Sequence, residues 1–311
     1  MSTPQEVRVA NAAWGDGAAK LSVLIPFKGK GDDPSNLIIM LGRETVAVEL
    51  VILDDGTGDP VLADRVAQVV RASPLPALFI SLPSNVGRAK GRNRLAAEAR
   101  SGHFLFLDSD MAPDDDAFLG SWLAHIAAED PPVTFGGFSL KQVPLRRDQA
   151  LHRQMAAHSD CLPSEVRRLH AEKHIFTSNL LVRRDVFAAD SFDEGFSGWG
   201  WEDVEWGMRV ARRWPIRHID NTATHLGLDT AATLALKYEQ SATNFARVAT
   251  NHPEVVRSYP SYRVAQALKR APLRSLWRPV LKALALTDGA PLPARAFAMR
   301  LYRAALYAET I

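Results

Sequence analysis

The sequence predicts an α/β protein built around a mostly parallel sheet, and three observations support this fold class. Short apolar runs rich in β-branched and aromatic residues alternate with helical patterns through the first half of the chain, as they do in βαβ units. The 311 residues suffice to bury a large core. Polar clusters follow several of the apolar runs, and parallel sheets bind their ligands at the carboxyl ends of the strands.

The predicted elements follow one another in regular order. In the first half we predict strands at residues 20–26, 46–56, 77–81 and 103–110, and helices at 61–71 and 87–102. In the second half we predict strands at 133–140 and 174–182, and helices at 202–214 and 229–251. The last fifty residues have the pattern of basic amphipathic helices interrupted by Pro279, Pro291 and Pro293. We therefore expect an N-terminal extension at 1–20, a main domain at 21–255 divided after 110, and a helical tail at 256–311.

The composition is that of an ordinary globular protein, with 47% hydrophobic and 23% charged residues, and a net charge of +2 argues against a general nucleic-acid binder. The charge is uneven, because Tyr262 to Ile311 holds nine basic and two acidic residues, a net +7, which leaves −5 for the rest. A basic tail indicates an anionic partner.

Targeting signals are absent from the sequence. Cys161 is the only cysteine, which rules out an intramolecular disulfide and fits a reducing compartment. The first twenty residues lack the apolar run of a signal peptide, and no stretch approaches the ~20 apolar residues that span a bilayer. We expect a cytoplasmic protein, and peripheral attachment to the inner face of the cell membrane stays open.

The segment "DSD" at Asp108 to Asp110 ends the fourth predicted strand. Two carboxylates one residue apart suit Mg²⁺ or Mn²⁺, which in turn bridge phosphates. A turn in which the aspartates bond their own backbone is the alternative. Because polar clusters end the neighbouring strands as well, we favour metal binding.

Two more clusters stand at predicted strand ends. "SNVGRAKGRN" at 84–93 and the following Arg94 place four basic side chains around glycines where a strand passes into a helix, which favours a phosphate. The segment matches neither standard nucleotide loop, and a solvated basic helix face is the alternative. Asp54 and Asp55 suit hydrogen bonds to a base or ribose, or the capping of a turn. His225 suits a metal ligand, although a lone histidine is more often structural.

The stretch "GWGWEDVEWG" at 198–207 combines glycines, indoles and acids. Its acids Glu202, Asp203 and Glu205 open a helix whose far end is basic, which is the charge order that the helix dipole prefers. That order does not explain "GWGW", whose flat indole faces suit the stacking of a sugar ring. A carboxylate beside them would be desolvated, as a general base needs.

Taken in order, these segments resemble the family 2 glycosyltransferases of the GT-A fold. The resemblance rests on "LSVLIPFKGK", "ELVILDDGTGD", "SNVGRAKGRNRLAAEARSGHFLFLDSDM", "TSNLLVRRDVF" and "FDEGFSGWGWEDVEWGMRV". The DxD motif together with "GWGxED" is similar to the inverting galactosyltransferase and chondroitin-polymerase type. Trp201 departs from this pattern, because relatives often have a small residue there. The resemblance implies a GT-A sheet flanked by helices, with a nucleotide-sugar half at 21–110, an acceptor half at 111–255 and a C-terminal helical extension.

The resemblance also implies roles for individual residues. Donor binding would fall to five of them, with Asp55 near the uracil or ribose and the arginines near the diphosphate: Pro26, Asp55, Arg88, Arg92 and Asp108. A divalent cation, Mn²⁺ or Mg²⁺, would be held by Asp110 and His225 together with Asp108. Trp199 and Glu202 would contact the acceptor sugar. Asp203 would be the catalytic base.

The predicted activity is therefore metal-dependent transfer of a sugar, with inversion, from a UDP-sugar to a saccharide or lipid-linked acceptor, in the building of a surface glycan. A sugar-phosphate nucleotidyltransferase is an alternative, but "PFKGKGDDPSN" is only a weak version of the glycine-rich loop that it needs. A non-catalytic nucleotide-sugar-binding scaffold is another, and the intact set of acids argues against it. The basic tail is expected to bind an anionic membrane, to pack on the body or to form a homodimer contact.

Overall fold

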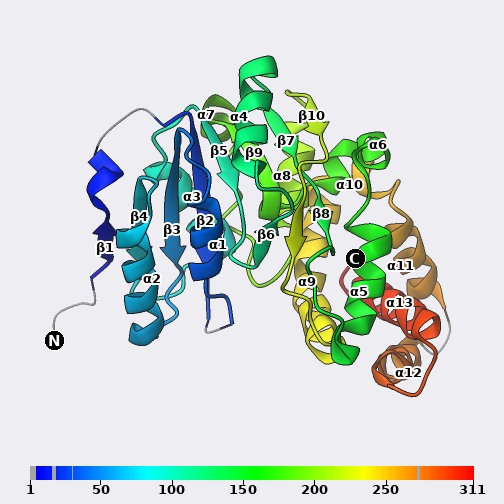
Figure 1. The fold of residues 1–311 in the computed structure, drawn as a ribbon. Helices are drawn as coiled ribbons and strands as arrows, with labels where there is room; N and C mark the ends of the chain where they lie inside the picture. Colours follow the sequence, from blue (N-terminus) through cyan, green and yellow to red (C-terminus); the bar gives the residue numbers. More distant parts are fainter. Residues whose placement is uncertain (1–4, 16–18, 30, 272–273) are drawn as a thin grey trace.

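The computed structural model describes residues 5–15, 19–29, 31–271 and 274–311. Parts of the predicted N-terminal extension, residues 1–4 and 16–18, lie outside this description. The main sheet has eight strands in the order β1-β4-β3-β2-β5-β9-β7-β10 (Figure 1). Its first five strands in the chain are β1 (Val7–Ala10), β2 (Leu21–Phe27), β3 (Val48–Asp54), β4 (Ala77–Ser81) and β5 (His103–Phe106).

Strands β2 to β5 are parallel, and their order fixes where the helices lie. From β2 through β4 the chain moves one way across the sheet, and it then returns past β2 to β5. Since such crossovers are right-handed, the helices of the first two connections cover one face and the helix of the return covers the other. These helices are α1 (Ser35–Leu41), α2 (Pro60–Ala72) and α3 (Arg88–Glu98).

The second half completes the sheet with antiparallel pairing, because β9 (Leu180–Arg183) runs against both β5 and β7 (Val133–Phe135). β10 (Ile216–His218) closes the edge. A small second sheet joins β6, β11 and β8. Its strands and the helices of this half are β6 (Met111–Pro113), β8 (Phe138–Ser139), β11 (Ala223–His225), α4 (Phe118–Glu129), α5 (Ala150–Ser159), α6 (Ser164–Arg167), α7 (Arg184–Ala189) and α8 (Glu202–Val210).

The single strand predicted at 133–140 is wrong, because the chain breaks into β7 and β8, which belong to different sheets. Gly137 causes the break with a φ of +94°, a backbone conformation that favours glycine. Its neighbour Gly136 is pressed against backbone and side chains, since a Cβ added there would lie 2.5 Å from Asn179 Nδ2. The strand predicted at 174–182 is also shorter, because a 3₁₀ turn at Thr177–Asn179 precedes β9.

The C-terminal region is helical, and it packs on the body of the molecule (Figure 1). Its helices are α9 (Ala231–Asn251), α10 (Pro253–Val256), α11 (Pro260–Arg270), α12 (Arg274–Leu286) and α13 (Leu292–Thr310). Pro279 does not interrupt a helix as predicted, because it lies in the second turn of α12, where it costs one backbone hydrogen bond. No helix within the described ranges has the length and apolarity needed to cross a membrane.

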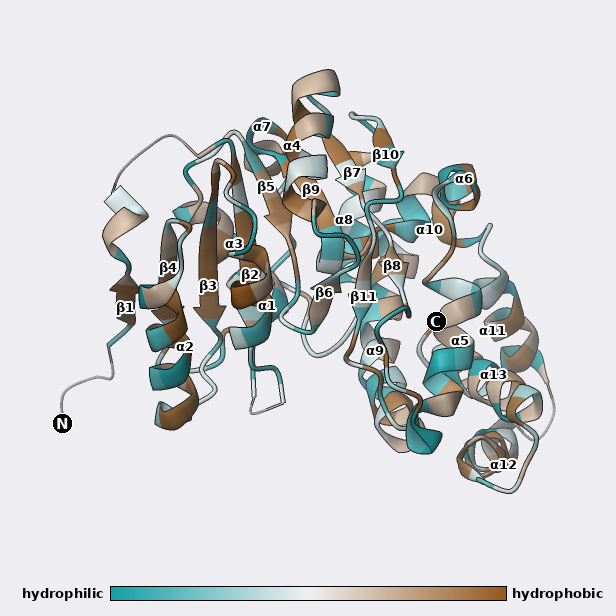
Figure 2. Ribbon diagram, in the orientation of Figure 1, coloured by the Kyte–Doolittle hydropathy of each residue, from teal (hydrophilic) through white to brown (hydrophobic). Residues whose placement is uncertain are grey.

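Two clusters of buried side chains organise the interior. The first lies around the main sheet, whose central strands are mostly hydrophobic (Figure 2) and are buried over nearly their whole length, as expected for strands covered on both faces. The second joins α5, α8 and α9 to α11, α12 and α13. The predicted α/β class, with a mostly parallel sheet flanked by helices and a C-terminal helical extension, is confirmed.

Candidate active site

The carboxyl ends of β2, β3 and β5 lie side by side in the sheet, and the predicted donor residues gather there. Pro26 is half-buried and stands in register with Leu53, one position before the end of each strand. Asp55 follows β3 directly and is buried. Its backbone N–H donates to the carbonyl of Phe27 at 3.0 Å. The strand ends are therefore tied together at the place where a ligand of such a sheet binds.

Asp55 shapes the loop before α3. Its carboxylate accepts hydrogen bonds from Asn85 Nδ2 at 2.6 Å, from the N–H of Val86 at 2.7 Å and from the N–H of Gly87 at 3.2 Å. Burial raises the pKa of Asp55, and the two backbone donors oppose that rise. Gly87, with a φ of +95°, then starts α3. Asp55 thus orders the loop that delivers the basic side chains of α3.

Arg92 of α3 and Asp108, which follows β5, form an ion pair in which the arginine is buried. Arg92 Nη2 donates to Asp108 Oδ1 at 2.7 Å, and Ser178 Oγ donates to Asp108 Oδ2 at 2.8 Å. The Arg92 side chain is 2% exposed. Burial alone would raise the pKa of Asp108, but Arg92 and Arg88 outweigh it and hold that pKa below its usual range. Asp108 is therefore an anion fixed on both of its oxygens.

Glu202 links the first turn of α8 to this network. Its buried carboxylate accepts a hydrogen bond from Arg88 Nε at 2.6 Å and lies 3.9 Å from Arg92 Nη1. Burial would raise the pKa of Glu202, and the two arginines lower it instead. The predicted contact of Glu202 with an acceptor stays a prediction, because its carboxylate is used here to join α3 to α8.

Asp203, the next residue, has the opposite electrostatics. Burial, followed by repulsion from the Glu202 carboxylate, raises the pKa of Asp203 to about 7, although Arg88 opposes the shift. Its Oδ1 accepts a hydrogen bond from the N–H of Val204 at 2.8 Å. The pKa values of these two neighbouring carboxyl groups are thus shifted in opposite directions. Glu202 stays ionised, and Asp203 exchanges protons near neutral pH. Such a pair is typical of acid–base sites.

Asp110 and His225 meet across two elements that are far apart in the sequence. His225 Nε2 lies 3.2 Å from Asp110 Oδ2, since β11 pairs with β6 directly after the DxD segment. Burial would lower the pKa of His225, and Asp110 reverses the effect and raises it. Gly227 leaves room for this pair, because a Cβ there would overlap Asp110 Oδ2.

The donor atoms at this place fit a divalent cation in kind. Asp110 Oδ1 is buried without a hydrogen-bond partner, and oxygen and imidazole ligands suit Mn²⁺ or Mg²⁺. Within the described part of the chain, however, no three His, Cys, Asp or Glu side chains are grouped closely enough to hold a metal. Asp108 stands apart because Arg92 and Ser178 hold it. The described side chains therefore supply a partial site, as expected where phosphates complete the coordination.

Aromatic side chains from other helices pack against the "GWGW" loop that precedes Glu202 and Asp203. Trp199 is half-buried and packs on Tyr238 of α9 at a ring-centroid distance of 6.1 Å. Trp201, at a φ of +78°, caps α8 and faces away into the second cluster. Its Nε1 donates to the hydroxyl of Tyr307 in α13 at 3.0 Å, and its ring lies 4.9 Å from Phe245. Trp201 therefore anchors the tail to the loop, and Trp199 is the indole left near the acids.

Sequence reasoning assigned no role to several residues that the structure brings here. Ser178 bonds Asp108 and lies in the segment "TSNLL". Asp32, in the loop after β2, has its pKa raised by burial and then by Asp110, so it faces the DxD segment. Tyr238 and Tyr307 come from helices with no local signal of a site. For Asp32 the signal was present in "GKGDD", which was weighed only as a phosphate loop.

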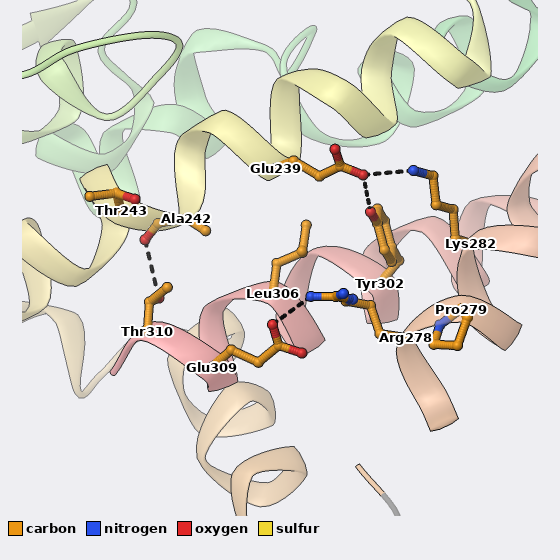
Figure 3. A pocket seen from close by; sticks show the side chains of 10 residues that line it. All are labelled: Glu239, Ala242, Thr243, Arg278, Pro279, Lys282, Tyr302, Leu306, Glu309 and Thr310. Carbon is orange, nitrogen blue, oxygen red and sulfur yellow. Dashed lines mark hydrogen bonds and ion pairs between the residues drawn. The ribbon is translucent and has the colours of Figure 1, made fainter. Parts of the chain in front are cut away.

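A cavity of about 570 Å³ lies elsewhere, between α9, α12 and α13 (Figure 3). Its charged side chains are paired with one another. Glu239 binds both Lys282 at 2.7 Å and the hydroxyl of Tyr302, and Arg278 binds Glu309 at 2.6 Å. Since these charges are already satisfied, the cavity gives no sign of a ligand, and the pairs act to hold α12 against the body.

Comparison with known proteins agrees with this geometry. Residues 37–189 match the family model described as Glycosyl transferase family 2. No curated protein sequence gives a significant match. A mannosyltransferase from Pyrobaculum calidifontis, solved with GDP-Man and Mn²⁺, aligns at a TM-score of 0.61 and 13% identity, over 93% of this chain and 86% of that one. TarS residues 1–349 from S. aureus, solved with UDP, aligns at a TM-score of 0.52 and 16% identity, over 91% and 89% of the two chains.

The similarity to solved structures concerns the fold, and the family model covers only those residues of the site that lie between 37 and 189. The matched span contains α3 and the DxD segment, and it ends before "GWGWED". The roles predicted for individual residues stay predictions. Residues 37–189 are therefore similar to the Glycosyl transferase family 2 model, and the architecture of the chain is that of the GT-A fold.

Proposed function

We propose that this protein is an inverting glycosyltransferase of the galactosyltransferase and chondroitin-polymerase type, which moves a sugar from a UDP-sugar to a hydroxyl group of a saccharide. The observation that carries the proposal is Asp203, a partly buried carboxylate whose pKa is raised to about 7 beside a charged network at the ligand-binding edge of the sheet. A general base works best when its pKa lies near the operating pH.

The chemistry follows from how this carboxylate is placed. Asp203 takes the proton of the acceptor hydroxyl while that oxygen attacks the anomeric carbon from the face opposite the leaving diphosphate, so one displacement inverts the configuration. Arg88, of which 40% of the side chain is exposed, supplies positive charge near the departing phosphates. Asp110 and His225 would hold Mn²⁺ or Mg²⁺, which when bound neutralises negative charge on the diphosphate, while Asp108 stays with Arg92 and Ser178.

The choice of a UDP-sugar is supported by the pocket residues and by one neighbour. Pro26 and Asp55 lie at adjacent strand ends, where a nucleoside would rest on the sheet edge. TarS was solved with UDP, whereas the Pyrobaculum mannosyltransferase was solved with GDP-Man. Trp199 is only half-buried, so its indole ring would be able to stack on the acceptor sugar.

We further propose that α12 attaches the protein to an anionic membrane, which would bring it to a lipid-linked acceptor. One side of α12 exposes four apolar residues at 41–59% of their area: Leu276, Trp277, Val280 and Leu284. The C-terminal region that bears them is strongly basic, and the combination is typical of interfacial helices. Cosedimentation with phosphatidylglycerol vesicles should be lost in Leu276→Glu and kept in Leu145→Glu. Failure of the wild-type protein to bind vesicles, whether or not it dimerises, would overturn this attachment.

The test of the activity is Asp203→Asn, with Asp185→Asn as a matched control, since Asp185 is an exposed aspartate paired with Arg183. We expect Asp203→Asn to bind UDP normally in calorimetry while UDP release from a UDP-sugar with acceptor falls about 10²- to 10⁴-fold. Asp185→Asn should keep full activity. Wild-type rates in Asp203→Asn would remove Asp203 from the role of base, and pyrophosphate release from UTP and a sugar phosphate would point to a nucleotidyltransferase instead.

A further inference from the structure

The C-terminal helix α13 carries Arg303 to the edge of the aromatic pair of Tyr238 and Trp199, and Trp199 precedes the candidate base Asp203 by four residues. Arg303 is partly buried, and its Cζ lies 5.1 Å from the ring centroid of Tyr238. Tyr238 in turn packs on Trp199, and Lys237 Nζ lies 5.8 Å from the ring of Trp199. Two aromatic rings from α9 and from the "GWGW" loop are thus flanked by a cation on either side.

The two cations, Lys237 and Arg303, differ in whether a carboxylate of a described residue pairs with them. Lys237 forms an ion pair with Asp229 at 2.7 Å. Arg303 makes no ion pair with a carboxylate of any described residue; its guanidinium lies beside the ring of Tyr238, and Asp160 acts on it only from a distance. By contrast, Arg278 and Arg295 of the same tail are paired with Glu309 and Asp288.

The groups around Arg303 leave its charge in place. Burial would lower the pKa of Arg303, but Tyr238, Tyr307 and Asp160 outweigh it and raise that pKa. Burial raises the pKa of Asp160, so the carboxyl group that acts on Arg303 from a distance is a weaker anion. A partly buried guanidinium without a carboxylate partner has lost water without gaining an anion, which is costly unless a ligand supplies one.

We propose that Arg303 binds a negatively charged group on the acceptor, a carboxylate or a phosphate, while Trp199 and Tyr238 contact the sugar ring that bears it. This assignment rests on the proposed function, because it takes the aromatic surface beside Asp203 as the acceptor side. A planar guanidinium recognises both kinds of anion through paired hydrogen bonds. The acceptor class would then be an acidic saccharide, either a uronic acid or a phosphorylated sugar.

Helix α13 contacts the site through two residues, Arg303 and Tyr307. Tyr307, one turn after Arg303 on α13, bonds Trp201 at the start of the helix that carries Asp203. The same helix therefore fixes the loop of the base and presents the cation. An acidic sugar held by Arg303 would be placed by a rigid element rather than by a loop, which favours precise positioning of its hydroxyl group.

Binding of three sugars tests the proposal: glucuronic acid, glucose 6-phosphate and glucose, each titrated into the protein with UDP and Mn²⁺ and followed by ligand-observed NMR. We expect at least one acidic sugar to bind about tenfold or more tighter than glucose. Which of the two does so distinguishes a carboxylate from a phosphate. Arg303→Gln should remove the difference, Arg303→Lys should keep part of it, and Arg270→Gln, at an exposed arginine of α11, should leave it unchanged.

The outcomes separate this proposal from the activity itself. Equal binding of acidic and neutral sugars by the wild-type protein would overturn it, as would an equal loss in Arg270→Gln. Thermal melting of each variant shows whether the fold is kept, and Arg303→Lys guards against a loss caused by unfolding alone. If the protein releases UDP with a neutral acceptor but ignores acidic ones, only the role of Arg303 fails, whereas absent UDP release with intact binding of acidic sugars would sink the transfer activity alone.

Discussion

The two sides of the candidate site are built from different materials. On the donor side, charged groups at the sheet edge are held by partners on several oxygens at once, as Asp55 and Asp108 are. On the acceptor side, rings and cations come from α9, α13 and the "GWGW" loop, and Arg303 has no carboxylate partner within the described chain. A preformed network suits a ligand shared across a family, and a surface with unsatisfied charge suits a ligand particular to one protein.

The span that matches the family model also separates the donor side from the acceptor side. It covers the ends of β3 and β5 and the whole of α3, it leaves out β2 with Pro26, and it stops before the residues that surround Trp199. Most of the donor side therefore lies within the span that is similar to the family model, and the acceptor side lies outside it. Four predictions would break or sharpen the comparison, beginning with the largest expected effect.

Replacing Arg92 tests whether the donor network is a unit. Arg92→Leu leaves Asp108 and Glu202 in a buried place with fewer positive neighbours, and we expect the free energy of unfolding to fall by about 3–5 kcal/mol in urea denaturation. Arg65→Leu is the control, because Arg65 binds Asp33 with 58% of its side chain exposed, and it should cost less than about 1 kcal/mol. Similar losses in both variants would show that the Arg92 pair is no more than a surface contact.

Gly227→Ala tests the metal part of the donor side. A Cβ at this position would overlap Asp110 Oδ2, so the Asp110 side chain must leave its place beside His225. We expect Mn²⁺ affinity in the presence of UDP, measured by calorimetry, to fall roughly 10- to 100-fold. Gly102→Ala has open space around its new Cβ and should bind Mn²⁺ as the wild type does. Unchanged affinity in Gly227→Ala would exclude Asp110 as a ligand.

The pH dependence of sugar transfer tests Asp203, the candidate base, which lies next to Glu202 of the donor network. Because the pKa of Asp203 is raised to about 7, the carboxylate is protonated below that pH and cannot accept another proton. We expect kcat/KM to fall about tenfold for each pH unit below 7 and to level off above it. Glu202→Gln removes a carboxylate that raises the pKa of Asp203, so the inflection should move to lower pH. A profile that is flat through pH 7 in the wild type would contradict the assigned base.

The sequence predicted the features that depend on neighbouring residues, and it did not predict those that depend on contacts between distant segments of the chain. The strands at 21–27, 48–54 and 77–81 are buried runs whose pattern is local, and the predicted fold class is confirmed. The strand predicted at 133–140 failed because Gly137 adopts a positive φ that no apolar pattern reveals. Residues such as Ser178 are placed by packing of distant segments.

On the acceptor side, most of the residues could not be predicted from the sequence. Trp199 was singled out from its neighbours in "GWGW", and Tyr238 and Arg303 were not, because each lies in a helix with ordinary amphipathic spacing. Only the packing of α13 on α9 brings them together. The tail was expected to lie on a membrane, on the body or on a second copy, and the structure shows that α13 packs on the body. A local pattern describes which face of a helix is buried, but it does not name the helix that covers it.

The smallest expected effect concerns the contact by which the tail holds the loop. Tyr307→Phe removes the hydroxyl that accepts a hydrogen bond from Trp201 Nε1 and meets Ser241 Oγ at 3.3 Å, while the stacking on Phe245 is kept. We expect about 1 kcal/mol of lost stability and a raised KM for the acceptor with unchanged UDP affinity, since the donor network lies on the other side. Tyr262→Phe removes a hydroxyl bonded only along its own helix to Gln266 and should change neither constant. If Tyr307→Phe weakened UDP binding as much as acceptor binding, the two sides would not be separate, and α13 would support the whole site rather than its acceptor half.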